Sequence, residues 1–254
     1  MSKKGCGIKM ILVDDVPDFS KNTIKYPKNK PCKTMTELFD KMNGKLIVFE
    51  GIDGAGKSTQ INELMSYLKN KNISTKKCSF KQSSIVYHSI LKGKWENYDP
   101  YTSLLLNLAS ITDTLAREII PALKRGKVVL MDRYVYSLLV RAKVRGVNDD
   151  FGHVLDVLRK PDIIIYINVD VQTALHRKKI EREEQVSYWE AGCDMELATN
   201  KIENWTKYQK MIQKEYHKIF ANEEKCIWIE SLDNISINKE QICNAVIRKL
   251  PNNM

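Results

Sequence analysis

The sequence has few cysteines and histidines, and none of them stand close together. The six cysteines form no CxxC pair, and no histidine cluster lies near any of them. This spacing argues against a disulfide framework and against a zinc site. We therefore expect free, buried thiols in a reducing compartment, and histidines that lie on the surface or serve in packing. The residues are Cys6, Cys32, Cys78, Cys193, Cys226 and Cys243, with His88, His153, His176 and His217.

Long hydrophobic runs are also missing. The longest apolar stretches, such as residues 163–169, are too short to cross a bilayer. The first residues are basic and briefly apolar, but Asp14 and Asp15 follow at once and no small-residue cleavage site appears, so we expect no signal peptide. The sequence thus predicts a soluble cytoplasmic protein that has no membrane partner.

The charge is unbalanced toward the basic side, with 41 Lys and Arg against 31 Asp and Glu and a net charge of +10 over 254 residues. A basic surface is typical of nucleic-acid-binding proteins, but it also suits a protein that handles polyanionic nucleotides. The sequence contains no RNP signature, zinc finger or basic heptad region. The charge excess by itself therefore does not separate the two classes. On the motifs described below, we expect small-molecule nucleotides, and no nucleic acid, as partners.

Residues 1–44 differ from the rest of the chain. They contain nine lysines against five acidic residues, and Pro17, Pro27 and Pro31 interrupt any long element. Residues 8–13 could form a strand and residues 36–42 a short helix. We interpret 1–44 as a partly ordered basic extension of a domain that spans 45–254. A regulatory or partner-binding arm is the alternative.

From Lys45 onward, strand-like and helix-like patterns alternate. Near-continuous apolar, β-branched runs indicate strands that are covered on both faces, as in a parallel sheet. Between them, apolar residues recur at three- and four-residue spacing, as in amphipathic helices. The alternation predicts an α/β fold, a three-layer α/β/α sandwich with a five-stranded parallel sheet. The expected strands are 45–50, 76–80, 127–132, 162–169 and 225–230, and the expected helices are 58–70, 101–120, 201–220 and 237–250.

The first strand runs into the sequence GIDGAGKS, which matches the phosphate-loop pattern GxxxxGK[ST]. Its glycines let successive backbone N–H groups point into one concavity, and the helix that follows adds its positive end. Lys57 would place a charge between the β and γ phosphates, and the Ser58 hydroxyl would hold Mg²⁺. A plain glycine-rich turn is the structural alternative. The predicted triphosphate-binding residues are Gly51, Ile52, Asp53, Gly54, Ala55, Gly56, Lys57, Ser58 and Thr59.

A second motif, VVLMDRY, spans residues 128–134. Ligand-facing groups of parallel sheets lie at the carboxyl ends of strands. Asp132 can therefore reach the magnesium shell, and Arg133 can hold a second anion. The alternatives are a strand-end turn residue and a surface arginine.

A third stretch, HRKKIEREE at 176–184, has five basic side chains within seven positions. Phosphoryl transfer needs positive charge against the oxygens of the transferring group. A mobile basic segment would supply this charge from Arg177, Lys179 and Arg182. The interleaved glutamates also fit an ordinary solvated helix face.

With these motifs in view, the chain from Lys45 onward resembles the thymidylate kinase family of P-loop nucleoside monophosphate kinases. The similarity is carried by LIVFEGIDGAGKSTQ, IIPALKRGKVVLMDRY and KPDIIIYINVD. The resemblance implies a sheet of order 2-3-1-4-5, ATP with Mg²⁺ as donor, a lid and a homodimer. It implies that Asp53 contacts the acceptor's sugar and that Arg133 binds the acceptor's phosphate. Gly54, where one branch of the family has arginine, favours the lid arginines Arg177 and Arg182 as catalytic.

The departures from the family pattern concern the acceptor. Asn107 and Ile111 stand where the family has a base-stacking aromatic residue and a base-bonding arginine. Arg141 replaces a tyrosine that discourages a ribose 2′-hydroxyl. Lys81 could substitute for an absent arginine after the second strand, and Tyr188 and Glu190 could keep part of a motif beyond the lid. Because a site that bonds a polar base edge discriminates strongly, we expect a changed acceptor preference.

Three hypotheses follow. The first is ATP-dependent phosphorylation of a nucleoside monophosphate, dTMP to dTDP by resemblance. The second keeps the chemistry and changes the acceptor to UMP, CMP or a modified monophosphate. The third is a nucleotide-binding regulator that has lost catalysis and uses residues 1–44 as a docking arm.

Overall fold

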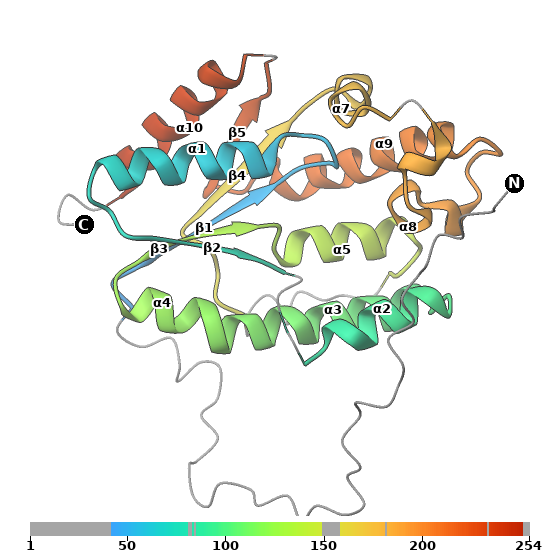
Figure 1. Ribbon diagram of the computed structural model, residues 1–254, viewed down its shortest axis with the longest axis horizontal. Coiled ribbons are helices and arrows are strands. Elements are labelled where there is room, and N and C mark those ends of the chain that lie inside the picture. Colours follow the sequence, from blue (N-terminus) through green and yellow to red (C-terminus); the bar gives the residue numbers. More distant parts are fainter. Residues whose placement is uncertain are drawn as a thin grey trace, which may run out of the picture. The chain divides into compact units, whose positions relative to one another are not determined.

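The computed structural model describes residues 42–80, 83, 85–148, 158–180, 182–232 and 234–250. Five parallel strands form one sheet in the order β2-β3-β1-β4-β5 (Figure 1). The predicted sheet and its strand order are therefore confirmed, and the fold is that of P-loop NTPases. The strands are β1 (Lys45–Glu50), β2 (Thr75–Ser79), β3 (Val128–Asp132), β4 (Ile163–Asn168) and β5 (Cys226–Glu230).

The three central strands are almost entirely buried, whereas most residues of the edge strands β2 and β5 are only partly buried or exposed. This difference explains the continuous apolar runs of β1, β3 and β4, because helices cover both faces there. In the register of the sheet, Phe49 on β1 lies beside Asp132 on β3. The loop after β1 and the end of β3 consequently meet at one edge of the sheet.

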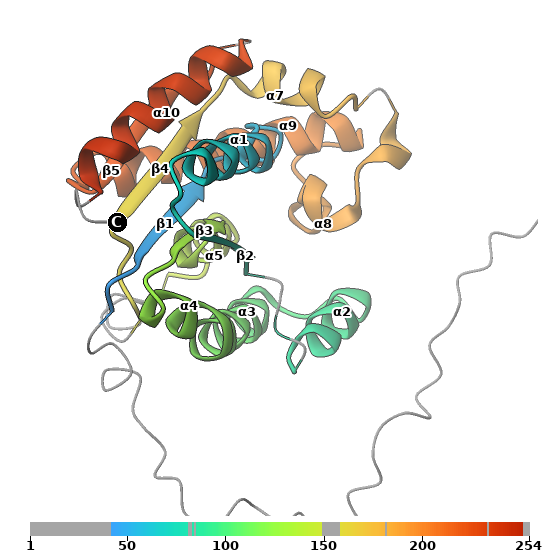
Figure 2. The same cartoon turned by 60° about the vertical axis from the view of Figure 1, so that its left-hand side comes forward.

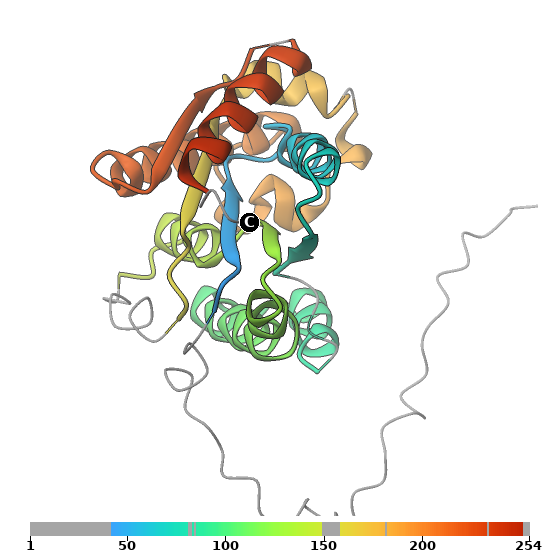
Figure 3. The same ribbon diagram turned by 90° about the vertical axis from the view of Figure 1, so that its left-hand side faces the viewer.

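The helices surround this sheet. α1 packs against α10, and α5 packs against both α3 and α9. Figure 2 shows α2 beside α3, and Figure 3 shows that these two helices and the pair α1 and α10 lie on opposite sides of the strands. The longer helices are α1 (Lys57–Asn70), α2 (Tyr87–Trp95), α3 (Pro100–Thr114), α5 (Val135–Val144), α9 (Lys201–Phe220) and α10 (Ile235–Lys249). The shorter ones are α4 (Ile120–Lys124), α7 (Val171–Arg177) and α8 (Tyr188–Ala191).

The helix expected at 101–120 is longer and less regular than predicted. It starts at Pro100, where the Asp99 side chain accepts hydrogen bonds from the backbone N–H groups of Tyr101 and Thr102. It then widens into a π-helical turn at Leu115–Ile119 and continues as α4. Pro121 lies in the first turn of α4 and has no N–H to donate, so the regular hydrogen-bond ladder is interrupted there.

Helix α9 has the predicted bounds, although its composition is polar. One stripe of large side chains is buried, at positions three or four apart. These residues, Trp205, Tyr208, Ile212, Tyr216 and Phe220, pack α9 into the core.

Several predictions lie outside the described residues: the strand at 8–13, residues 36–41 of the short helix, and Lys81. In the part of the chain that the structure describes, every helix is too short or too polar to cross a membrane.

Candidate functional site

The phosphate loop joins β1 to α1 through backbone conformations that require glycine. Gly54 has a φ of 86°, and a Cβ built there would lie 2.4 Å from the carbonyl oxygen of Ala174 in α7. A side chain at position 54 would therefore meet both strain and a backbone clash. The close approach also sets α7, and the basic segment that follows it, directly against the loop.

Lys57 lies inside this loop. Its Nζ donates hydrogen bonds to the carbonyl oxygens of Gly51 (3.2 Å) and Ile52 (2.8 Å), and the residue is only 6% exposed. Burial and the nearby Arg133 lower the pKa of Lys57 to about 7, although the carboxylates of Asp53, Asp132 and Glu50 oppose this shift. A polyphosphate beside this amine would favour its charged form.

Ser58 and Asp132 face each other at the carboxyl edge of the sheet. Ser58 Oγ donates a hydrogen bond of 2.7 Å to Asp132 Oδ2. A hydroxyl and a carboxylate oxygen side by side match the hard oxygen ligands that Mg²⁺ prefers, together with water and phosphate oxygens. These two side chains therefore fit a magnesium ion.

Asp53, the third residue of the loop, is surrounded by hydrogen-bond donors. It forms an ion pair with Arg133 Nη2, and both of its oxygens accept from Arg141 Nη2 at 3.2 and 3.1 Å. Gln209 adds a weaker hydrogen bond of 3.3 Å. Burial alone would raise the pKa of Asp53, but Arg141, Arg133 and Lys57 hold it well below its usual range. Asp53 is thus a permanent anion that fixes two guanidinium groups.

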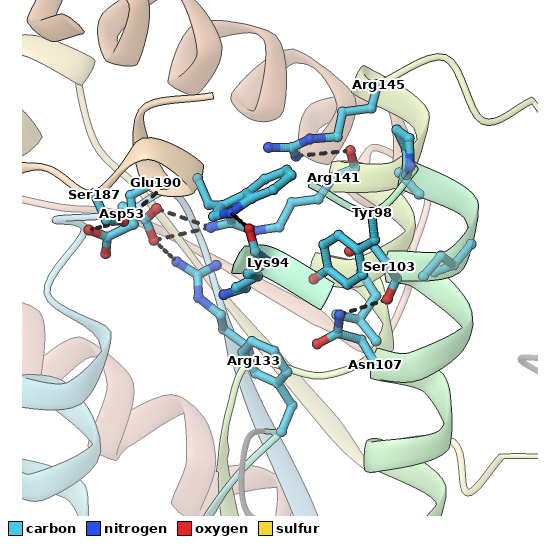
Figure 4. A pocket seen from close by; sticks show the side chains of 16 residues that line it. Asp53, Lys94, Tyr98, Ser103, Asn107, Arg133, Arg141, Arg145, Ser187 and Glu190 are labelled. Atoms are coloured by element: carbon cyan, nitrogen blue, oxygen red, sulfur yellow. Dashed lines mark hydrogen bonds and ion pairs between the residues drawn. The ribbon is translucent and has the colours of Figure 1, made fainter. Parts of the chain in front are cut away.

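These two guanidinium groups form one end of a cavity of about 420 Å³ (Figure 4). The other end is lined by Tyr98, Ser103 and Asn107, and the Arg141 side chain reaches from α5 to Asp53 at the first end. The cavity thus has a cationic end next to the phosphate loop and an aromatic, polar end away from it.

The structure places the predicted acceptor residues unequally. Asp53, Asn107, Arg133 and Arg141 line this cavity together. Ile111, one turn beyond Asn107 on α3, is completely buried in the hydrophobic core, and the α3 part of the wall consists of Pro100, Ser103, Leu104 and Asn107.

Tyr188 is 44% exposed, and its neighbour Trp189 lines the cavity instead. Trp189 Nε1 donates to the Lys94 carbonyl at 3.0 Å, and its ring meets Tyr98 edge to face at 5.6 Å. The chain after α7 therefore closes one wall of the cavity through an indole ring.

Several residues that line the cavity were not predicted from the sequence, among them Tyr98, Arg145 and Trp189. Arg145 lies four residues after Arg141 on the same face of the α5 region, and it pairs with Asp194 (2.7 Å). Helical spacing alone could have pointed to it. Tyr98 and Trp189 belong to no motif, and only the fold brings them together.

A second cavity, of about 440 Å³, adjoins the other side of the phosphate loop. Gly54, Ala55, Gly56 and Thr59 line it from the loop and α1, Ser231 from the β5–α10 connection, and Asn238 from α10. Arg177 also lies here, with Nη1 donating to Ser231 Oγ (2.9 Å) and Nη2 to the Leu232 carbonyl (3.0 Å).

The three basic residues predicted to act together are therefore separated. Arg177 borders the second cavity, whereas Lys179 and Arg182 are exposed and belong to the wall of neither cavity among the described residues. Lys179 has a φ of 54°, which marks a sharp turn after α7.

Comparison with known proteins agrees with this geometry. A family model described as thymidylate kinase matches residues 49–242. The chain belongs to the thymidylate kinase family. It is therefore an enzyme of the nucleoside monophosphate kinase class, a phosphotransferase.

Relatives in this family cover most of the chain. The "Probable thymidylate kinase 2" of Saccharolobus solfataricus is 32% identical over 212 residues, which are 81% of this chain and 98% of that protein. The "Thymidylate kinase" of Caldicellulosiruptor saccharolyticus is 33% identical over 200 residues, 75% of this chain and 89% of that protein. The matches to these thymidylate kinases thus extend over nearly their whole lengths.

Proposed function

We propose that the protein transfers the γ-phosphoryl group of ATP to a nucleoside monophosphate, with dTMP giving dTDP as the first candidate reaction. One observation supports this most strongly: Asp53 of the phosphate loop pairs directly with Arg133 and Arg141 of the adjacent cavity. A donor triphosphate in the loop and an acceptor phosphate at the guanidinium end would therefore be neighbours. Such proximity is the main requirement of phosphoryl transfer.

On the donor side, the backbone amides of the loop, with Lys57, Ser58 and Thr59, would bind the triphosphate. The second cavity would hold the donor's nucleoside beside Arg177. Ser58 and Asp132 would hold Mg²⁺, which neutralises charge on the phosphate oxygens when bound. The segment with Arg177, Lys179 and Arg182 leaves α7 next to the loop, and we propose that it contributes further positive charge to the transferring group.

On the acceptor side, Arg133 would bind the phosphate of the monophosphate, and Asp53 and Arg141 would lie next to its sugar. The base would enter the end lined by Tyr98, Asn107 and Trp189. Aromatic rings suit a flat base, and a carboxamide can both donate to and accept from a base edge.

The lining of this end also supports a second candidate, a kinase for another pyrimidine monophosphate such as UMP or CMP. Ile111 is buried, and the polar groups near the base end are Tyr98, Ser103 and Asn107. A carboxamide can present either its oxygen or its nitrogen, so Asn107 is compatible with several base edges.

A coupled assay of ADP release across the common ribo- and deoxyribonucleoside monophosphates tests both candidates. We expect turnover with a pyrimidine monophosphate, dTMP foremost, and the best acceptor separates the first candidate from the second. Binding of ATP without turnover of any monophosphate would refute the kinase proposal and favour a nucleotide-binding regulator.

We also propose that the protein forms a homodimer. In support, α2 exposes a stripe of Tyr87, Leu91 and Trp95 at four-residue spacing, and Trp95 is 86% exposed. Exposed apolar patches of this kind are typical of protein interfaces. Light scattering on the wild type and on Trp95→Glu would test this, with a monomer expected for the variant.

A further inference from the structure

Glu50, the last residue of β1, is completely buried, and it contacts residues that surround Arg133. Its carboxylate accepts three hydrogen bonds. Tyr134 donates its backbone N–H to Oε1 at 2.8 Å, and the hydroxyls of Ser137 and Tyr216 donate to Oε2 at 2.5 and 2.8 Å. Buried carboxylates are costly unless they are paired in this way, so the arrangement indicates a specific task.

The first hydrogen bond controls the backbone at Arg133. Arg133 has a φ of 65°, a left-handed conformation that is unfavourable for a residue with a Cβ. Its own N–H donates to the Phe49 carbonyl at 3.0 Å, and the next N–H, that of Tyr134, donates to Glu50. The end of β1 thus accepts hydrogen bonds from the peptide N–H groups on both sides of the Arg133 Cα atom, and these bonds stabilise its strained conformation.

The other two hydrogen bonds control the Arg133 side chain. Arg133 Nη1 donates to the Gly51 carbonyl at 2.9 Å, and it makes longer hydrogen bonds to Ser137 Oγ at 3.2 Å and Tyr216 Oη at 3.5 Å. Both hydroxyls lie within hydrogen-bond distance of Glu50 Oε2, and their oxygens are also 2.7 Å from each other. Because an ionised carboxylate only accepts, it draws hydroxyl hydrogens toward itself and leaves oxygen lone pairs available to the guanidinium group. A carboxylate at position 50 therefore orients the Ser137 and Tyr216 hydroxyls so that their oxygens can accept hydrogen bonds from Arg133.

We propose that Glu50 is the positioning residue for Arg133, acting through the Tyr134 backbone and through the Ser137 and Tyr216 hydroxyls. The inference rests on the proposed role of Arg133 as the group that binds the acceptor's phosphate. Glu50 itself lies outside the wall of the acceptor cavity that the described residues form. Its effect on the reaction is therefore indirect, because Glu50 acts by placing the guanidinium group of Arg133.

The substitution Glu50→Gln keeps the size of the side chain and tests the relay. An amide NH₂ facing the two hydroxyls would turn them into acceptors and direct their hydrogens toward Arg133, where two donors would then oppose each other. We expect the KM for the best monophosphate to rise about tenfold, which corresponds to about 1.4 kcal/mol, because a charged group would lose well-oriented acceptors. The KM for ATP should stay within about twofold, because Lys57 and the loop keep their contacts.

A purely structural role for Glu50 would give a different result. Val246→Ala, a cavity-forming change in α10 far along the chain from this cluster, serves as the control for lost stability. It should lower the midpoint of denaturant unfolding without changing the KM for the monophosphate. If Glu50→Gln also lowered only the midpoint, the proposal would be wrong.

Two further measurements keep the test decisive. Tyr216→Phe retains the carboxylate and removes one acceptor of Arg133, so it should raise the monophosphate KM even if Glu50→Gln does not fold. In addition, the Nε–Hε NMR signal of Arg133, assigned with Arg133→Lys, should be sharp in the wild type and broadened or shifted in both variants. This signal needs no turnover. It therefore tests Glu50 even if the wild type phosphorylates no monophosphate, and an unchanged signal would overturn the inference.

Discussion

Ser58 Oγ lies 2.7 Å from Asp132 Oδ2, although 74 positions separate the two residues in the sequence. The parallel register of β1 and β3 causes this contact, since it sets the end of β3 beside the start of the phosphate loop. The pair unites the two oxygen ligands that a magnesium ion would need from the protein.

Replacing Asp132 by Asn should therefore weaken the metal site while leaving the fold intact. We expect turnover to fall about a hundredfold, the usual scale for losing one electrostatic group of an active site, and the dependence on Mg²⁺ concentration to shift upward. Titration of Mg²⁺ in the ADP-release assay measures both effects, and chelation with EDTA should stop turnover in the wild type. Asp113→Asn is the matched control, because it breaks an ion pair between Asp113 on α3 and Arg117 in the π-helical turn that follows. Equal Mg²⁺ curves for wild type and Asp132→Asn would disprove the assignment.

Lys57→Met should strongly reduce transfer, because methionine keeps nearly the length of the lysine side chain but removes its charge. We expect a loss of about a hundredfold or more in kcat, together with weaker binding of ATP. Isothermal titration with ATP and the coupled assay measure the two effects separately. Wild-type turnover in this variant would contradict every role proposed for the loop.

The lowered pKa of Lys57 predicts proton uptake when a nucleotide binds. At about pH 8 the amine, with a pKa of about 7, is mostly neutral, and an adjacent polyphosphate raises that pKa and restores the charge. The wild type should therefore take up to about one proton per triphosphate bound near pH 8 and clearly less near pH 6. Calorimetry in buffers of different ionisation enthalpy measures this uptake, and Lys57→Met should lack it. Proton release at the higher pH would show that the sign is wrong.

Arg141 provides a test of sugar preference. It lines the cavity and pairs with Asp53, and its guanidinium group has further donors that could reach a sugar hydroxyl. Arg141→Tyr should lower kcat/KM for a ribonucleotide relative to its deoxy counterpart by about tenfold. The 2′-hydroxyl would lose a hydrogen bond from the guanidinium group, and the tyrosine ring would crowd it. Paired assays with UMP and dUMP measure the ratio. An unchanged ratio would remove Arg141 from sugar recognition.

Removal of residues 1–41 tests whether the basic extension belongs to the catalytic domain. The described structure begins just before β1, and the Gly44 N–H already donates to the Leu123 carbonyl at 2.9 Å. We expect the truncated chain to keep the turnover and unfolding midpoint of the full-length protein. Loss of activity would instead make the extension part of the active fold, and retained activity would assign it to localisation or partner binding.

Local sequence signals were sufficient for much of this molecule. The apolar runs of β1, β3 and β4 predict buried parallel strands, and GIDGAGKS predicts the loop, because each depends on neighbours in the chain. Even the irregular end of α3 has a local cause, Pro121. Asp132 and Arg133 could be selected because a strand end places them at the ligand edge.

Contacts between side chains from distant segments could not be predicted from local sequence signals. Nothing near Arg177 in sequence shows that Ser231 and Leu232 hold it beside the second cavity. Asn107 and Ile111 occupy successive turns of α3, yet one lines the acceptor cavity and the other is buried in the core. That difference depends on which face of α3 packs against α5, and residues far away in the sequence decide this packing.

The amino-acid sequence by itself determined the strands, the phosphate loop and the family resemblance, because backbone preference and hydrophobic period act over a few residues. Only the tertiary structure decided the acceptor cavity with Tyr98, Arg145 and Trp189, and the pairing of Asp53 with Arg133 and Arg141. It also decided the buried network of Glu50. Each of these depends on Coulomb attraction, desolvation and hydrogen bonding between groups that are adjacent only after the sheet and its helices have packed.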